Sequence, residues 1–137
     1  AHASPATLRD VTAMATRPLI VSHTGVKGTC NNQRNLSDDE LRAVAHTNGV
    51  IGIGLWDTAT CGPAARAAAR AIHYVMNIVG ADHVALGSDF DGGITAPFDS
   101  SGWALLTDAL LQEGISEQDI HKIMGENVVR VLLEVLP

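Results

Sequence analysis

Short apolar runs alternate with longer amphipathic stretches along the whole chain. The apolar runs are nearly free of charge, which is typical of strands buried on both faces of a sheet, and they cover 18–23, 49–55 and 83–87. The stretches around them carry apolar residues at helical spacing and predict helices over 4–15, 37–48, 63–79, 101–113 and 117–135. Strands that alternate with such helices predict parallel βα units with right-handed crossovers, so the expected fold class is α/β.

Several local signals mark where these elements begin and end. Ser4 followed by Pro5 favours the start of the first helix, and Ser37 followed by Glu40 forms a capping box for the second. Between them, residues 24–35 are rich in Gly, Asn and Thr, which predicts a loop. The small residues of 49–54 indicate close approach of neighbouring backbones in the second strand.

The chain reads as a single domain over residues 1–137, because no repeat, linker or low-complexity segment interrupts the pattern. Its 46% hydrophobic and 18% charged residues exclude a disordered protein. A net charge of −6 makes nucleic acid an unfavourable partner. The longest uncharged stretch, 71–81, is too short and polar to be a transmembrane segment. The chain begins at Ala1 without an initiator Met or a signal peptide, so we expect an N-terminus made by processing, cloning or cutting.

Two cysteines, Cys30 and Cys61, are too few and too far apart for a zinc finger or a disulfide-rich scaffold. We expect two reduced thiols in a cytoplasmic protein, with a single bridge between them as the alternative.

Polar side chains follow the predicted strands at their carboxyl ends, where α/β folds place their chemistry. His23 ends the first strand, and Asp89 follows the third, with Asp91 two residues further on. His2 lies 21 residues before His23, where another strand would end. Two imidazoles on adjacent strands of one rim suit a shared zinc ion, and nearby carboxylates would add charge and general-base capacity.

Each of these residues also has a plainer interpretation. A single His at a strand end is commonly a structural residue, and residues 89–92 could be an ordinary turn. A calcium loop starting at Asp89 is unfavourable, because Gly93 and Ser100 occupy ligand positions. Arg34 is the cation nearest the rim and could hold a carboxylate in bidentate fashion, or remain a solvated loop residue. We expect the remaining histidines to be structural or surface residues: His46, His73, His83 and His121.

Four segments together resemble the membrane (renal) dipeptidase family of binuclear zinc peptidases: 18–23 (PLIVSH), 34–38 (RNLSD), 85–92 (ALGSDFDG) and 125–130 (GENVVR). The resemblance implies an amidohydrolase-like (β/α)8 TIM barrel. It implies that His2 and His23 bind one zinc, that Arg34 pairs with the terminal carboxylate of a dipeptide, and that Asp89 acts at the active centre near the substrate's amino group. Such an enzyme cleaves the peptide bond with a metal-activated water.

This sequence lacks the His-x-Asp pair and the bridging Glu that the family uses to complete a site with two zinc ions. A full barrel typically needs about 250 residues. We therefore expect the C-terminal half of a dipeptidase, with at most one partial zinc site and no activity of its own. Two alternatives stay open: a non-catalytic half-barrel that associates with itself or with a complementing chain, and a metal-dependent amidohydrolase with a non-dipeptide substrate.

Overall fold

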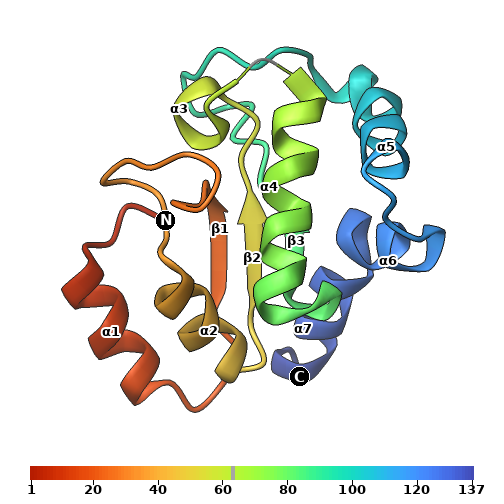
Figure 1. Cartoon of the computed structure of the whole chain (residues 1–137). Helices are drawn as coiled ribbons and strands as arrows, with labels where there is room; N and C mark the ends of the chain where they lie inside the picture. The colour runs from red at the N-terminus through yellow and green to blue at the C-terminus, as the bar shows by residue number, and fades with distance from the viewer. Residues whose placement is uncertain (63) are drawn as a thin grey trace.

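Three parallel strands form the centre of the computed structural model, which describes residues 1–62 and 64–137 (Figure 1). The strands are β1 (Ile20–Thr24), β2 (Val50–Ile53) and β3 (Val84–Leu86), in the order β1-β2-β3. Ile20 is paired with Val50 in the first ladder, and Ile51 with Val84 in the second. The three predicted strands and their parallel arrangement are therefore confirmed.

Helices precede, connect and follow the strands. They are α1 (Pro5–Met14), α2 (Asp38–His46), α3 (Asp57–Thr60), α4 (Ala64–Val79), α5 (Trp103–Gln112), α6 (Glu117–His121) and α7 (Asn127–Val135), with the short 3-10 turns Ala81–His83 and Ser100–Gly102. The single helix expected over 117–135 is divided by a kink at Gly125, within the π-helical turn Lys122–Glu126. The short helix α3 was not predicted, and the expected helix start at residue 63 lies outside the described residues.

The capping signals of the sequence act as expected. The Ser4 hydroxyl accepts a hydrogen bond from the Thr7 N–H at 3.1 Å, which holds the first turn of α1. Ser37 and Glu40 form the predicted capping box of α2, with the Ser37 N–H donating to Glu40 at 2.7 Å. Residues 1–4 lie outside any regular element, so the strand expected to end at His2 stays a prediction.

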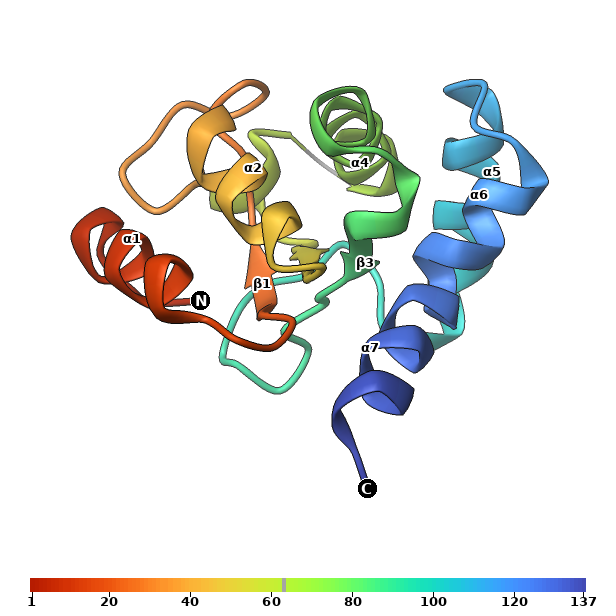
Figure 2. The ribbon, with the colours of Figure 1, turned by 90° about the horizontal axis from the view of Figure 1, so that it is seen from below.

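The core lies between the sheet and the helices α2 and α4, which cover one face of the sheet (Figure 2), and it extends to apolar residues of α5 and α6. Every residue of β2 is buried, because this central strand has neighbours on both edges. An added Cβ at Gly52 would collide with the Ser22 carbonyl of β1, which confirms the close backbone approach expected in this strand. The largest fully buried side chains of the core include Leu41, Ile51, Ile53, Ile72, Leu106 and Leu110.

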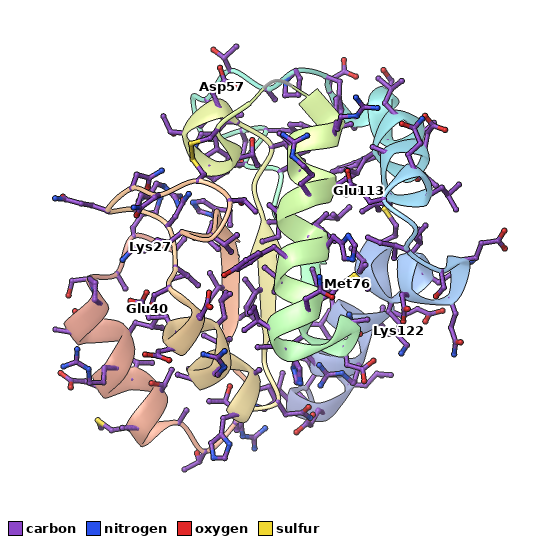
Figure 3. The ribbon with its side chains drawn as sticks, viewed as in Figure 1. Lys27, Glu40, Asp57, Met76, Glu113 and Lys122 are labelled. Atoms are coloured by element: carbon purple, nitrogen blue, oxygen red, sulfur yellow. A yellow bond between two sulfur atoms is a disulfide. The ribbon has the colours of Figure 1, made fainter. Side chains whose placement is uncertain are left out.

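A disulfide joins Cys30 to Cys61, across 31 positions of the chain (Figure 3, beside α3). The expectation of two reduced thiols is therefore wrong. Sequence spacing could not reveal this bond, because the fold brings the loop after β1 and the end of α3 to a Cα–Cα distance of 5.1 Å, which suits a disulfide.

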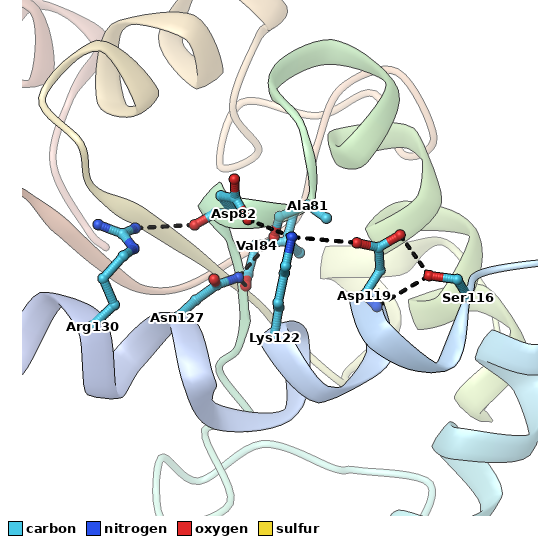
Figure 4. Close-up of polar contacts among 8 residues, drawn as sticks. All are labelled: Ala81, Asp82, Val84, Ser116, Asp119, Lys122, Asn127 and Arg130. Carbon is cyan, nitrogen blue, oxygen red and sulfur yellow. Dashed lines mark hydrogen bonds and ion pairs between the residues drawn. The ribbon is translucent and has the colours of Figure 1, made fainter.

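Two residues of the 125–130 segment hold α7 to the amino ends of the strands (Figure 4). Asn127 is buried, and its side-chain amide donates to the carbonyls of Ala81 and Val84 at 2.7 and 2.8 Å. The Arg130 guanidinium donates to the carbonyls of Asn48 and Asp82, both at 3.0 Å. This segment therefore has a structural role at the edge of the sheet opposite the candidate site.

Candidate metal centre at the carboxyl ends of the strands

His23 is the fourth residue of β1, next to its carboxyl end. Its Nδ1 atom lies 3.0 Å from the Ser22 hydroxyl, and this contact leaves Nε2 directed elsewhere. That Nε2 atom lies 3.0 Å from the Nε2 atom of His2. A partner on one ring nitrogen fixes the orientation of an imidazole and prepares the other nitrogen for a ligand.

His2 reaches this position from the segment that precedes α1. The chain begins beside the carboxyl end of β1 in Figure 1, and α1 then runs toward the amino end of the strands. His2 is exposed and has a left-handed backbone conformation, with φ of 57°. The two histidines expected at one rim therefore meet, although His2 reaches that rim from an irregular segment rather than from a strand.

Asp89 approaches the same imidazole from the segment after β3. Its Oδ2 atom lies 3.9 Å from the His23 Nε2 atom, and both side chains are mostly buried. The Asp89 backbone has a φ of 59°, an uncommon value for a residue with a side chain, and such conformations concentrate at functional sites. The carbonyl of Asp89 accepts a hydrogen bond from the Gly92 N–H at 2.9 Å. Residues 89–92 therefore form a turn, and its first residue lies at the rim.

Arg34 lies in the loop between β1 and α2, and its guanidinium carbon is 4.7 Å from the centroid of the Trp56 ring. Trp56 follows β2, and its ring also lies 5.9 Å from the His23 ring, centroid to centroid. Residues that follow all three strands thus gather at one rim. Trp56 was not among the expected site residues, although its position directly after the second predicted strand was a usable signal.

Burial is the main influence on the His23 imidazole, and it lowers the pKa of that group below its ordinary value. The Asp89 carboxylate opposes this shift, whereas the positive charges of Arg34 and His2 add to it. A lowered pKa favours the neutral imidazole, which is the form that binds a metal ion.

The two imidazoles fit part of a zinc site. In tetrahedral zinc coordination, two nitrogen ligands lie about 3.3 Å apart, close to the 3.0 Å between the Nε2 atoms of His2 and His23. Within residues 1–62 and 64–137, however, no three His, Cys, Asp or Glu side chains are grouped closely enough to hold a metal ion together. The described residues therefore offer two ligands, with the Asp89 carboxylate nearby, and not the three protein ligands of a usual catalytic zinc site.

Asp91 and the histidines expected to be structural or surface residues lie apart from this centre. Asp91 is exposed, and the Nδ1 atom of His83 lies 2.8 Å from the Gly49 carbonyl at the amino end of the sheet. His73 is 3.8 Å from Glu113 on the helical side of the molecule.

Cavities give little indication of a substrate site at this rim. A cavity of ≈ 310 Å³ lies between α1 and α2 and is lined in part by Lys27 and Glu40, which are labelled in Figure 3. The space beside His2 and Arg34 measures only ≈ 30 Å³. No described helix has both the length and the hydrophobicity needed to span a bilayer.

Solved structures of similar shape include a metallopeptidase and an amidohydrolase. A metallopeptidase from Rhodobacter sphaeroides, liganded with a phosphinate mimic of the dipeptide L-Ala-D-Ala, matches with a TM-score of 0.89 and 25% identity over 97% of this chain and 40% of its own. An amidohydrolase from Pseudomonas aeruginosa matches with a TM-score of 0.83 and 30% identity over 94% of this chain and 49% of its own. These likenesses confirm parallel βα units of the amidohydrolase-like barrel class.

Relatives by sequence are longer than this chain. Dipeptidase aclJ of Aspergillus oryzae is 37% identical over 98% of this chain and 34% of its own length. An uncharacterized protein in the pqqA 5' region of Klebsiella pneumoniae is 35% identical over 98% of this chain and 53% of its own length. The chain therefore spans between a third and about half of the length of these relatives.

The family model for membrane dipeptidases (Peptidase family M19) matches residues 1–136. The chain belongs to the membrane dipeptidase family.

Proposed function

We propose that the protein containing this chain is a zinc-dependent dipeptidase. One observation carries the proposal: two imidazole nitrogens 3.0 Å apart, a carboxylate 3.9 Å from one of them and a guanidinium held on the neighbouring Trp56 all lie at the carboxyl ends of three parallel strands. Membership of the membrane dipeptidase family and the likeness to a structure liganded with a dipeptide mimic support it.

In this proposal each side chain has its own role at the rim. His2 and His23 hold one zinc ion, which when bound would supply Lewis-acid polarisation of the peptide carbonyl. Arg34 pairs with the terminal carboxylate of the dipeptide through the two parallel hydrogen bonds that a guanidinium can donate. Asp89 binds the protonated amino group at the other end of the substrate and supplies negative charge beside the reacting bond.

Two histidines do not complete a catalytic zinc site, so the remaining ligands and a second zinc ion require residues beyond those described. We therefore propose that the 137-residue chain alone does not hydrolyse dipeptides. The proposed cytoplasmic location remains a prediction, and the Cys30–Cys61 bridge weighs against it, because disulfides are more typical of oxidising compartments.

Hydrolysis of Gly-Leu in the presence of zinc tests this function. The protein expressed from its complete gene should cleave Gly-Leu, H23A should abolish cleavage, and R34A should lower kcat/KM roughly 10- to 100-fold through lost carboxylate binding. Glu134→Gln, a substitution on α7 far from the rim, serves as the control and should leave kcat/KM unchanged. Cleavage by H23A at the wild-type rate would contradict the proposal, and turnover by the isolated chain would contradict its predicted inactivity.

A different substrate for the same centre is the second candidate, favoured by the likeness to an amidohydrolase at 30% identity. Lactams, esters or N-acyl amino acids would then replace dipeptides. Comparing kcat/KM for these classes with that for Gly-Leu separates the two candidates. R34A discriminates further, because it should affect only the substrates that bear a free carboxylate.

Self-association of the chain, or its pairing with a complementing chain, is the third candidate. Val129, Leu133 and Leu136 are exposed on and after α7, and Ile20 is half exposed on the edge strand β1. Exposed apolar faces and unpaired strand edges are typical association surfaces. Sedimentation of the chain at several concentrations tests this candidate, and a monomer at every concentration would contradict it.

A further inference from the structure

Trp56 is buried between two residues of the candidate centre. The residue is 7% exposed, with the Arg34 guanidinium carbon 4.7 Å from its ring centroid and the His23 ring 5.9 Å away at an interplanar angle of 62°. A guanidinium that lies over an indole face is attracted by the electrons of the ring while its N–H groups remain free at the edge. The contact therefore holds Arg34 and leaves its donors available.

The Trp56 ring is itself held in place by its surroundings. An added Cβ at Gly54 would collide with the indole, so the absence of a side chain there makes room for the ring directly after β2. The Trp56 carbonyl accepts hydrogen bonds from the N–H groups of Ala59 and Thr60, at 3.0 and 3.2 Å, at the start of α3. Backbone and side chain are thus both constrained, and the indole can act as a fixed platform.

The loop that carries Arg34 is attached to the same short helix. Asn32 accepts a hydrogen bond from the Arg34 N–H at 3.0 Å, and its amide donates to the Thr58 carbonyl at 2.7 Å. The buried Asn35 amide donates to the Ala59 carbonyl at 2.9 Å. Together with the disulfide to Cys61, these bonds make the Arg34 loop and the Trp56 segment one rigid frame.

We propose that Trp56 is a positioning residue for Arg34, which orients the guanidinium toward the rim and thereby selects substrates with a free terminal carboxylate. The inference rests on the proposed function of Arg34 and deepens it. An arginine has many rotamers, and the indole removes most of them before the substrate binds, so less conformational entropy is lost on binding. The effect should therefore fall on substrate binding, and only on substrates that Arg34 contacts.

The test compares Gly-Leu with Gly-Leu amide, which lacks the carboxylate, in the protein expressed from its complete gene. W56L should lower the preference in kcat/KM for Gly-Leu over its amide roughly 5- to 30-fold, mainly through KM. W56F retains an aromatic face and should restore most of the preference. The matched control is W103L, because Trp103 packs against Phe90 and Phe98 rather than Arg34 and should keep the preference unchanged. In an R34A background, W56L should have no further effect on the preference.

Several results would overturn the inference. The first is an equal loss of kcat/KM for Gly-Leu and its amide in W56L. The second is an effect of W56L on the substrate preference that persists undiminished in the R34A background. The third is a wild-type protein that does not prefer the substrate with the free carboxylate. A wild-type protein that cleaves neither substrate would refute the proposed function instead. In that case, NMR titration with Gly-Leu, followed at the Arg34 Nε–H resonance, tests the inference by binding alone. W56L should then bind Gly-Leu roughly 5- to 30-fold more weakly than the wild type. No binding by the wild type, or equal binding by W56L, would overturn it.

Discussion

Removing the bridge between Cys30 and Cys61 tests how much of the chain's stability depends on a single covalent link. The bridge spans 31 positions, and in the chain-entropy description a loop of this length stabilises the folded state by about 3–4 kcal/mol at 25 °C. For a chain of 137 residues, this corresponds to a fall of about 10 °C in Tm. We therefore expect a loss of this size in C30S/C61S.

Thermal and urea unfolding, followed by circular dichroism, should be measured for three forms of the chain: oxidised wild type, reduced wild type and the double serine variant. Reduction leaves both side chains in place, so agreement between the reduced protein and the variant assigns the loss to the cross-link rather than to altered packing of the buried Cys30. Added reductant should leave C30S/C61S unchanged, which is the control. Two reactive thiols in the folded, unreduced chain, or a Tm that does not respond to complete reduction, would refute the reasoning.

Three further predictions concern a buried amide, an ion pair and the metal. Asn127→Ala should lower the free energy of unfolding by about 2 kcal/mol, measured by urea unfolding, because two carbonyls at the sheet edge lose their donor; no measurable loss would contradict this role. The hydrogen bond from Lys122 lowers the pKa of Asp82, so this pair stabilises the fold above the ordinary carboxyl pKa of about 3.9 and less as the pH falls through the lowered value. Asp82→Asn should thus lower the Tm slightly at pH 7 and leave it unchanged near pH 2. A Tm difference between this variant and the wild type that grows as the pH falls would contradict the stabilising role of the Lys122–Asp82 pair. A chelator should barely change the Tm of the isolated chain, because His2 and His23 offer only two zinc ligands; a large fall in Tm would mean that the site is more complete.

The sequence identified most of the candidate centre because strand ends are readable from local pattern. His23 ends one apolar run and Asp89 lies two residues after another. Parallel strands place their carboxyl ends at one edge of the sheet, so the meeting of these two residues could be expected before the fold was known. His2 was found by its spacing from His23, and in the structure it lies in the irregular segment 1–4. Trp56 was missed because its role depends on Arg34 and His23, which approach it from other segments.

Hydrophobic periodicity and capping residues determined the three strands, their parallel βα arrangement and the boundaries of most helices, because these depend on interactions between near neighbours in the chain. Only the tertiary structure decided that Cys30 and Cys61 are bonded, that α3 forms, and that Gly125 kinks the last helical segment. Each of these depends on which distant segments come into contact. The physical reason is that local pattern specifies which faces must be buried, whereas packing specifies what each buried face will meet.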